Sequence, residues 1–506
     1  TVLGQGSADQ VLTSDGTDIS WADAAGGVDG LTGLVENNSI WLGADPSGTT
    51  STAAYNVSLG TTALDSITTG DNNSAIGYAA GTAITTGEQN TALGASALDA
   101  NSTGDRNTAI GYNALTANTT ASYNTAIGRG AMTMNTTGAN NTAVGYAALD
   151  ANETAADNTA VGSSALLRNT TGTNNTAVGT GALGHNLTTD DSTAVGKSAL
   201  ANSIAANNTA VGKGALNENT TGASNTSVGK DALKVNTTGA TNVAVGALAL
   251  DANTTASYNT AVGYASLGAN TTGGENTAVG VSALDSNTTA SNNTAVGGDA
   301  LGANTTGADN TGLGHFALYA NTTADNNTAV GKSALRYNST GATNTAVGAY
   351  ALDANTTASF NNAFGHNALG ANTTGAYNNA FGYQALLTQT TDGSENNAFG
   401  WEALKANTTG DNNVAFGNGT LTANTTGGLN VAVGNYSLDA NTTGAYNTAV
   451  GKDALTANTT ADYNVAVGAS ALGANTTASN NVAVGYGVLI VNTTGAGNTA
   501  VGWEAG

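Results

Sequence analysis

The chain is built on a repeat of 17 residues, and this period limits the folds open to it more than any other feature. Glycines that end an Asn-Thr-Ala-Val-like segment recur every 17 residues from Gly43 to Gly196. One step of 16 residues leads to Gly212, and one of 18 residues separates Gly382 from Gly400. Elsewhere the spacing of 17 continues to the last such glycine near the end of the chain, which makes 28 turns in 506 residues. Repeats of fixed length predict stacked units that bury a shared core.

The consensus is N-T-A-V-G-x-x-A-L-x-A-N-T-T-G/A-x-x, and we number its positions 1 to 17. Helical repeats are longer, about 33 to 47 residues, and frequent Asn, Thr and Gly disfavour helices. A single Pro leaves almost every backbone N–H able to pair with a neighbouring strand. The repeat therefore predicts an all-β parallel β-solenoid of about 28 coils. We expect one strand at N-T-A-V-G, a second at x-A-L-x-A, and corners at N-T-T-G/A and the two variable residues after it.

The small and polar residues of the repeat have conformational explanations. Glycine at position 5 permits a backbone conformation that a Cβ atom would resist. Asparagine at positions 1 and 12 tolerates the left-handed backbone region, and identical Asn side chains on stacked coils can hydrogen-bond to one another. Eighteen coils carry N-T-T at positions 12 to 14, which matches the N-glycosylation sequon. Glycans stacked at about 4.8 Å would collide, so we expect an Asn-Thr ladder instead.

The strand carries apolar residues on both of its faces. Successive side chains of a strand point to opposite sides, so Ala at position 3 and Val at position 4 lie on different faces. One face fills the interior of the coil, and the other forms a long apolar stripe on the surface. Stripes of this size mark interfaces, and a homotrimer of parallel chains would bury this one. The alternative is a single-chain solenoid that tolerates the stripe.

Phenylalanine replaces the position-4 Val in four successive coils. We expect these rings to form a stacked ladder in the structural core of a locally wider coil; they are Phe364, Phe381, Phe399 and Phe416. The single 18-residue coil falls among them. Its extra residue is expected to bulge in the corner near Asp392–Glu395.

The first 36 residues do not follow the repeat. Within them, QVLTSDG and DISWADA indicate a two-stranded hairpin across residues 14–17, followed by an Ala-Gly linker. We therefore divide the chain into an N-terminal hairpin and linker segment, residues 1–36, and a solenoid shaft, residues 37–506.

Composition disfavours several classes of function. The formal net charge of −23 argues against binding to nucleic acid or to an anionic membrane. No run of 18 apolar residues exists, so no membrane insertion is expected. Cysteine is absent, and His185, His315 and His366 occupy different coils. We therefore expect no enzyme activity, no cofactor and no dedicated metal site, with a Ca²⁺ ion in an acidic corner such as Asp190–Asp191 left open.

Tyrosine gathers at two repeat positions that bracket the strand. Twelve of the sixteen Tyr residues occupy position 17, just before N-T-A-V-G, or position 6, just after it. Such an aromatic surface suits glycans or a partner fibre; the alternative is corner packing that shields the strand ends. The candidate surface-contact residues are Tyr123, Tyr258, Tyr264, Tyr377, Tyr383, Tyr446 and Tyr463. Ice binding is a weaker alternative, because each strand offers a single outward Thr, such as Thr125 or Thr260.

The N-T-A-V-G-x-x-A-L core resembles the repeats in the heads of trimeric autotransporter adhesins, although those repeats are shorter and lack the N-T-T insert. The N-terminal GQGSADQVLTSDGTDISWADA resembles short modules of phage tail fibres. The first resemblance implies a left-handed parallel β-roll in a homotrimer. Together they imply an attachment fibre that is extracellular, on a cell surface or on a virion.

These features favour a structural fibre shaft that projects a receptor-binding tip or connects two surfaces. We expect self-association, as a homotrimer or in an end-to-end filament, and a cell-surface glycan or receptor as a further partner. Two alternatives stay open. One is a subunit of an extracellular matrix or surface filament, and the other is an adhesin that binds glycans directly through its Tyr-bearing corners.

Overall fold

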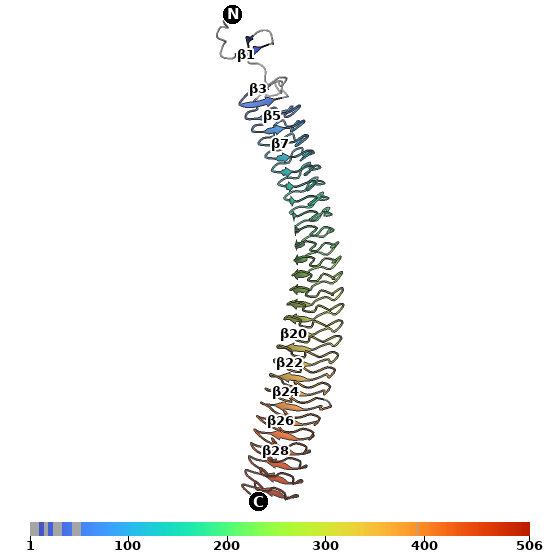
Figure 1. Cartoon of the computed structure of the whole chain (residues 1–506), viewed down its shortest axis with the longest axis vertical. Helices are drawn as coiled ribbons and strands as arrows, with labels where there is room; N and C mark the ends of the chain where they lie inside the picture. Colours follow the sequence, from blue (N-terminus) through green and yellow to red (C-terminus); the bar gives the residue numbers. More distant parts are fainter. Residues whose placement is uncertain (1–9, 15–18, 24–32, 43–51, 391) are drawn as a thin grey trace. The chain divides into compact units, whose positions relative to one another are not determined.

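The structure is a computed structural model that describes residues 10–14, 19–23, 33–42, 52–390 and 392–506. The chain divides into two compact units, Thr1–Lys230 and Asp231–Gly506. Each unit contains stacked coils that carry one short strand apiece (Figure 1). The described residues contain 27 of these three-residue strands, eleven in the first unit and sixteen in the second. The all-β parallel β-solenoid with a period of about 17 residues is thus confirmed.

Four longer strands precede the coils, namely β1 (Gln10–Ser14), β2 (Ile19–Asp23), β3 (Gly33–Glu36) and β4 (Ser39–Leu42). The coil strands of the first unit are β5 (Val57–Leu59), β6 (Ser74–Ile76), β7 (Thr91–Leu93), β8 (Thr108–Ile110), β9 (Thr125–Ile127), β10 (Thr142–Val144), β11 (Thr159–Val161), β12 (Thr176–Val178), β13 (Thr193–Val195), β14 (Thr209–Val211) and β15 (Thr226–Val228). Those of the second unit are β16 (Val243–Val245), β17 (Thr260–Val262), β18 (Thr277–Val279), β19 (Thr294–Val296), β20 (Thr311–Leu313), β21 (Thr328–Val330), β22 (Thr345–Val347), β23 (Asn362–Phe364), β24 (Asn379–Phe381), β25 (Asn397–Phe399), β26 (Val414–Phe416), β27 (Val431–Val433), β28 (Thr448–Val450), β29 (Val465–Val467), β30 (Val482–Val484) and β31 (Thr499–Val501).

Within each unit, every coil strand pairs in parallel with the equivalent strand of the next coil. The strand covers repeat positions 2 to 4, and equal positions lie opposite each other. This register persists through the two irregular coils, since Thr193 lies opposite Thr209 and Asn379 lies opposite Asn397. One missing or additional residue is therefore absorbed outside the strand.

The interior of the coil is narrow and filled by small and branched apolar residues. Ala143, Ala148 and Leu149, at positions 3, 8 and 9 of one coil, are fully buried, and the same positions are buried in most described coils. The side chains at positions 2 and 4 point outward. The strand thus has one buried and one outward apolar face.

The x-A-L-x-A segment is a turn, so the expected second strand is wrong. Positions 7 and 9 lie in the left-handed backbone region, as Asn113 (φ 56°) and Leu115 (φ 54°) illustrate. Position 17 is left-handed as well, with φ 63° at Tyr123. A left-handed Leu costs roughly 1–2 kcal/mol of backbone strain, which the burial of its side chain, worth about 1.5–3 kcal/mol, offsets. The left-handed residues bend the chain into tight turns in place of a second strand.

Glycine at position 5 satisfies two requirements at once. Gly111 has φ 134°, a conformation that L side chains rarely adopt. A Cβ atom there would lie 2.6 Å from the carbonyl oxygen of Gly128 in the next coil. The column of glycines therefore allows the backbones of successive coils to approach each other.

Two antiparallel hairpins precede the coils. In the first, β1 pairs with β2 so that Gln10 lies opposite Asp23, while the connecting residues 15–18 fall outside the described part. The second hairpin joins β3 to β4 through Asn37 and Asn38, both left-handed as a type I′ turn requires. Because β4 also pairs in parallel with β5, β3 covers the first edge of the coil ladder. This second hairpin was not expected from the sequence, and the expected boundary between residues 36 and 37 falls inside the hairpin.

Candidate functional surface

Two columns of buried asparagine form ladders along the coils. In one coil, the Nδ2 atoms of Asn90 and Asn101 both donate to the carbonyl oxygen of Gly104 at 2.9 Å. The Oδ1 of Asn90 accepts the backbone N–H of Asn107 at 2.9 Å, and the Oδ1 of Asn101 accepts Nδ2 of Asn118 at 2.8 Å. The expected asparagine ladder is therefore present. Because the position-12 sequon asparagines other than the half-buried Asn492 are buried, a folded coil does not expose them for glycosylation.

The two threonine columns have different roles. The hydroxyl of Thr425, at position 13, donates to the carbonyl oxygen of Thr442 in the next coil at 2.9 Å, and this contact recurs along the corner. The position-2 threonines, such as Thr125, make no side-chain hydrogen bond to protein among the described residues. Their hydroxyls are therefore available to solvent or to a partner.

Positions 2 and 4 together form a surface that we call the outer strand face. Position 2 is mostly Thr or Val, and position 4 is Val, Ile, Leu or Phe; neither position holds a charged residue. The position-4 side chains are substantially accessible, with 37% of Ile127 and 44% of Leu313 exposed. An uncharged, largely apolar strip thus follows the coil strands of each unit.

The four phenylalanines stack as expected but belong to the outer strand face, so their placement in the core is wrong. The centroids of Phe364 and Phe381 lie 4.6 Å apart, and those of Phe381 and Phe399 lie 4.7 Å apart, with nearly parallel rings. Phe416 follows Phe399 at 5.8 Å and is 56% exposed. The reason is the alternation of the strand: only the position-3 Ala points inward, so position 4 points outward whatever its size.

The tyrosines at positions 17 and 6 are exposed beside this face, and several stack on aromatic neighbours in adjacent coils. Tyr446 and Tyr463 are 4.8 Å apart, and Phe360 and Tyr377 are 5.0 Å apart. At position 6, Tyr383 lies between two further rings; its neighbours are His366 and Trp401. Three of the candidates differ: Tyr123 contacts the guanidinium of Arg106, while Tyr258 and Tyr264 have no ring contact among the described residues. Where rings stack on one another, mainly their edges face solvent.

The histidines and acidic corners do not converge on one site. The Nδ1 atom of His185 lies 2.7 Å from Oδ1 of Asn202, and His315 and His366 contact neighbouring rings. Asp190 accepts the backbone N–H of Thr173 at 2.6 Å. Across the described ranges, no group of three or more His, Cys, Asp or Glu residues could hold a metal ion. Nor does any described helix have the length and apolar character needed to cross a membrane.

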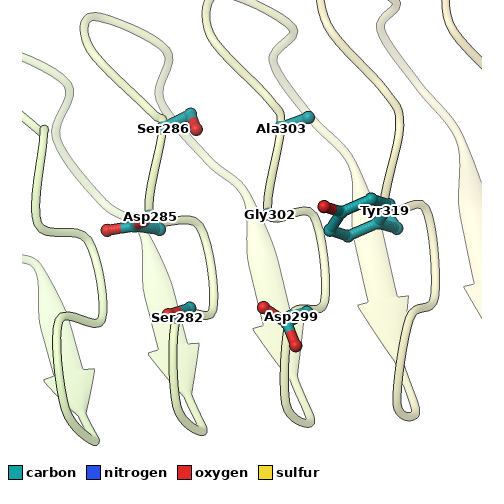
Figure 2. A pocket seen from close by; sticks show the side chains of 7 residues that line it. All are labelled: Ser282, Asp285, Ser286, Asp299, Gly302, Ala303 and Tyr319. Carbon is teal, nitrogen blue, oxygen red and sulfur yellow. The ribbon is translucent and has the colours of Figure 1, made fainter.

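A shallow acidic pocket lies on the turn side of the second unit, where Gly302 leaves open the place that Asp285 and Tyr319 fill in the coils on either side (Figure 2). The lining residues are Ser282, Asp285, Ser286, Asp299, Gly302, Ala303 and Tyr319. Burial raises the pKa of Asp285, and the nearby charge of Asp299 raises it further. Burial also raises the pKa of Asp251, two coils before. The pocket is thus an open hollow with a partly desolvated carboxyl.

Comparison with known proteins adds no family to this description. No protein-family model matches it, and no curated protein matches it. The resemblance to autotransporter heads and tail fibres stays a prediction. The chain is a β-solenoid repeat protein with coils of about 17 residues and asparagine ladders.

Proposed function

We propose that this chain is the shaft of an extracellular or virion fibre, and that it associates through its outer strand face into a homotrimer. The observation that carries the proposal is the outward column of Val, Ile, Leu and Phe at position 4, which has no charged residue in any coil. Exposed apolar surface of this extent is costly in water and typical of interfaces. In a trimer it would become the shared core.

The shaft role follows from how each coil is held. A coil pairs with its neighbours through strand hydrogen bonds, turn hydrogen bonds and two asparagine ladders. Each additional coil extends a stack by about 4.8 Å, the spacing between strands. Coil number would set the reach of the fibre, and the repeated contacts would give it stiffness and resistance to proteases.

Direct glycan binding is the weaker candidate because of the ring geometry. Sugars pack on the faces of aromatic rings, and in the stacked pairs Tyr377–Phe360 and Tyr446–Tyr463 those faces contact each other. Tyr258 and Tyr264 are exposed and have no ring contact among the described residues, so they are the residues with which this candidate would be tested. The filament alternative shares the same coil architecture and differs in the form of the assembly, which electron microscopy of the native particle distinguishes.

The proposal is tested by adding charge to the outer strand face. The triple variant Val178→Lys, Val195→Lys and Val211→Lys places lysines at position 4 of three successive coils. We expect it to keep its circular dichroism spectrum, since these side chains point outward, but to lose the trimeric mass in light scattering. The control adds three lysines at exposed corner positions of the same unit, at Thr171, Thr188 and Thr221. If face and corner variants keep the same oligomeric mass, the outer strand face is not the interface.

A further inference from the structure

The outer strand face lies between two flanks of opposite charge. Position 6, just after the strand, holds six of the eleven basic residues and no acidic residue; they are Arg129, Lys197, Lys213, Lys230, Lys332 and Lys452. Positions 16 and 17, just before the strand, hold one basic residue and twelve acidic residues. The acidic residues at position 17 are Asp157, Asp191, Glu275, Asp309 and Glu395. We call these two borders the basic flank and the acidic flank.

Contacts within the chain account for only part of this separation of acidic from basic residues. Carboxylates at position 16 have a role within the chain, as when Oδ1 of Asp462 accepts the backbone N–H of Ala445 at 2.7 Å. The five carboxylates at position 17 are exposed, and so are the six basic residues at position 6. Three of these six also have partners within the chain, namely Arg129 with Tyr112 and Tyr146, Lys332 with Tyr350, and Lys452 with Asp453. Like charges on neighbouring strands repel, so both flanks would gain from a surface of opposite charge.

We propose that a second copy of this chain covers the outer strand face in parallel orientation with its coils level, so that the basic flank of one copy meets the acidic flank of the next. This inference rests on the proposed self-association and adds the level register of the coils and the pairing of the two flanks. A two-fold or three-fold axis along the stack brings the basic flank of each copy to the acidic flank of its neighbour. Antiparallel copies facing each other would instead bring basic flank to basic flank and acidic flank to acidic flank.

The residues that bracket each strand support the level register. In level coils, position 17 of one copy meets position 6 of the next, and no described coil has like charges at these two positions. Several coils have complementary residues there: the pairs are Asp191 with Lys197, Asp309 with His315, Arg106 with Tyr112, Tyr123 with Arg129, and Tyr446 with Lys452. A shift of one coil would set the like charges of Arg106 and Arg129 against each other. Cations over aromatic rings and opposite charges attract, so the level arrangement is favoured.

The test uses the absence of native cysteine, because engineered thiols are then the only ones in the chain. The double variant Asp191→Cys with Lys197→Cys is treated with a short bismaleimide under native conditions and run on a denaturing gel. Parallel, level copies are expected to yield covalent species of two and three chains. Each single variant alone is expected to stay uncrosslinked, whereas a co-assembled mixture of the two single variants is expected to give linked pairs.

A register control moves one thiol along the basic flank. Asp191→Cys with Lys230→Cys offsets the two thiols by two coils, and we expect at least about tenfold less crosslinked product, because two strand spacings separate them. Equal crosslinking of this control, or crosslinking by Lys197→Cys alone, would overturn the inference. An oligomeric mass in light scattering without crosslinks in the double variant would overturn it while leaving the proposed shaft in place. A monomeric mass would overturn both.

Discussion

The asparagine amide is the residue-scale feature that joins one coil to the next. In a complete rung of the position-12 ladder the amide donates twice and accepts once: Asn424 donates to Asn407 and Gly427 and accepts from Asn441. Leaving a buried donor or acceptor unpaired costs about 1–3 kcal/mol. The ladder therefore specifies the stacking of coils as strictly as the apolar core does. Sequence predicted it, because identical Asn residues at a fixed period have few other uses.

Replacing one ladder residue tests this account. We expect Asn424→Ala to lower the local free energy of unfolding by about 1–3 kcal/mol, since it leaves Nδ2 of Asn441 without one of its two acceptors. Hydrogen exchange of amides in the neighbouring coils measures the change. The matched control is Asn418→Ala, which removes the same side chain from an exposed position. Equal effects of the two substitutions would mean that the ladder contributes little.

A second residue-scale prediction concerns Asp251 and pH. Burial raises the folded-state pKa of Asp251 above the ordinary value of 3.8, with further increases from Asp285 and Asp231. A raised pKa stabilises the fold below pH 3.8, and this contribution is lost as the pH rises through the folded-state pKa. Asp251→Asn should therefore raise stability at neutral pH and have no such benefit below pH 3.8. Urea unfolding at neutral pH and below pH 3.8 measures the free energy of unfolding, with the exposed Asp309→Asn as control. A gain in stability only at low pH would contradict a raised pKa for Asp251.

At the scale of the element, corner length follows the side chain at position 12. In the regular corners an Asn amide reaches the carbonyl three residues on, as Asn424 reaches Gly427. The 18-residue coil has Gln389, whose longer amide reaches Gly393, four residues on. The 16-residue coil has the shorter Ser203, whose hydroxyl lies 3.3 Å from the carbonyl oxygen of Ala205, two residues on. The additional residue falls between Gln389 and Gly393, in the corner where sequence placed the bulge, and Asp392 within this corner is left-handed.

This relation predicts coupling between one substitution and one deletion. Gln389→Asn alone should destabilise its coil because the shorter amide cannot span the longer corner. Deleting Asp392 alone should do the same because Gln389 is then too long. The double change restores the regular 17-residue corner, so we expect a favourable coupling of about 0.5–3 kcal/mol in a double-mutant cycle measured by thermal unfolding. Strictly additive effects would mean that side chain and corner length are independent.

Sequence was less informative about which way side chains point in the coil and about the backbone conformation of its turns. Phe364 was expected in the core because large aromatic side chains are usually buried. Side chains alternate along the strand, however, so the position-3 Ala points into the coil and position 4 points outward. Leu115 suggested a strand because nothing in its side chain signals a left-handed backbone. Both errors have the same cause. Residue type indicates the burial and backbone conformation that a residue prefers, whereas packing against equivalent residues in neighbouring coils determines those it adopts.

At the scale of the whole molecule, each coil needs only an equivalent coil on either side. Deleting residues 253–286 removes two whole coils of the second unit and brings Asn287 to the place of Asn253. We expect the variant to assemble and its shaft to shorten by about 10 Å, two strand spacings. Deleting eight residues in the same region would move apolar positions into corners and should abolish assembly. Electron microscopy and light scattering compare the two.

The same deletion shows whether these coils serve only as shaft or also bind the natural target. If these coils only extend the fibre, attachment to the natural target survives their removal. Loss of attachment by an intact, shortened fibre would instead place recognition on this segment, with Tyr258 and Tyr264 as the first residues to substitute. Sequence could predict the coil and its period because both repeat, whereas a target-specific surface depends on the variable positions, which carry no periodic signal.

The proposed shaft requires copies of the chain to cover the outer strand face of one another, and the mass of the assembled protein shows whether they do. One chain has a mass of 49.1 kDa. Light scattering coupled to size-exclusion chromatography is expected to give about three chain masses at neutral pH, with little dependence on salt because apolar contacts dominate the interface. A stable particle with the mass of a single chain would mean that the outer strand face stays uncovered and that the chain is not the shaft of a homotrimer.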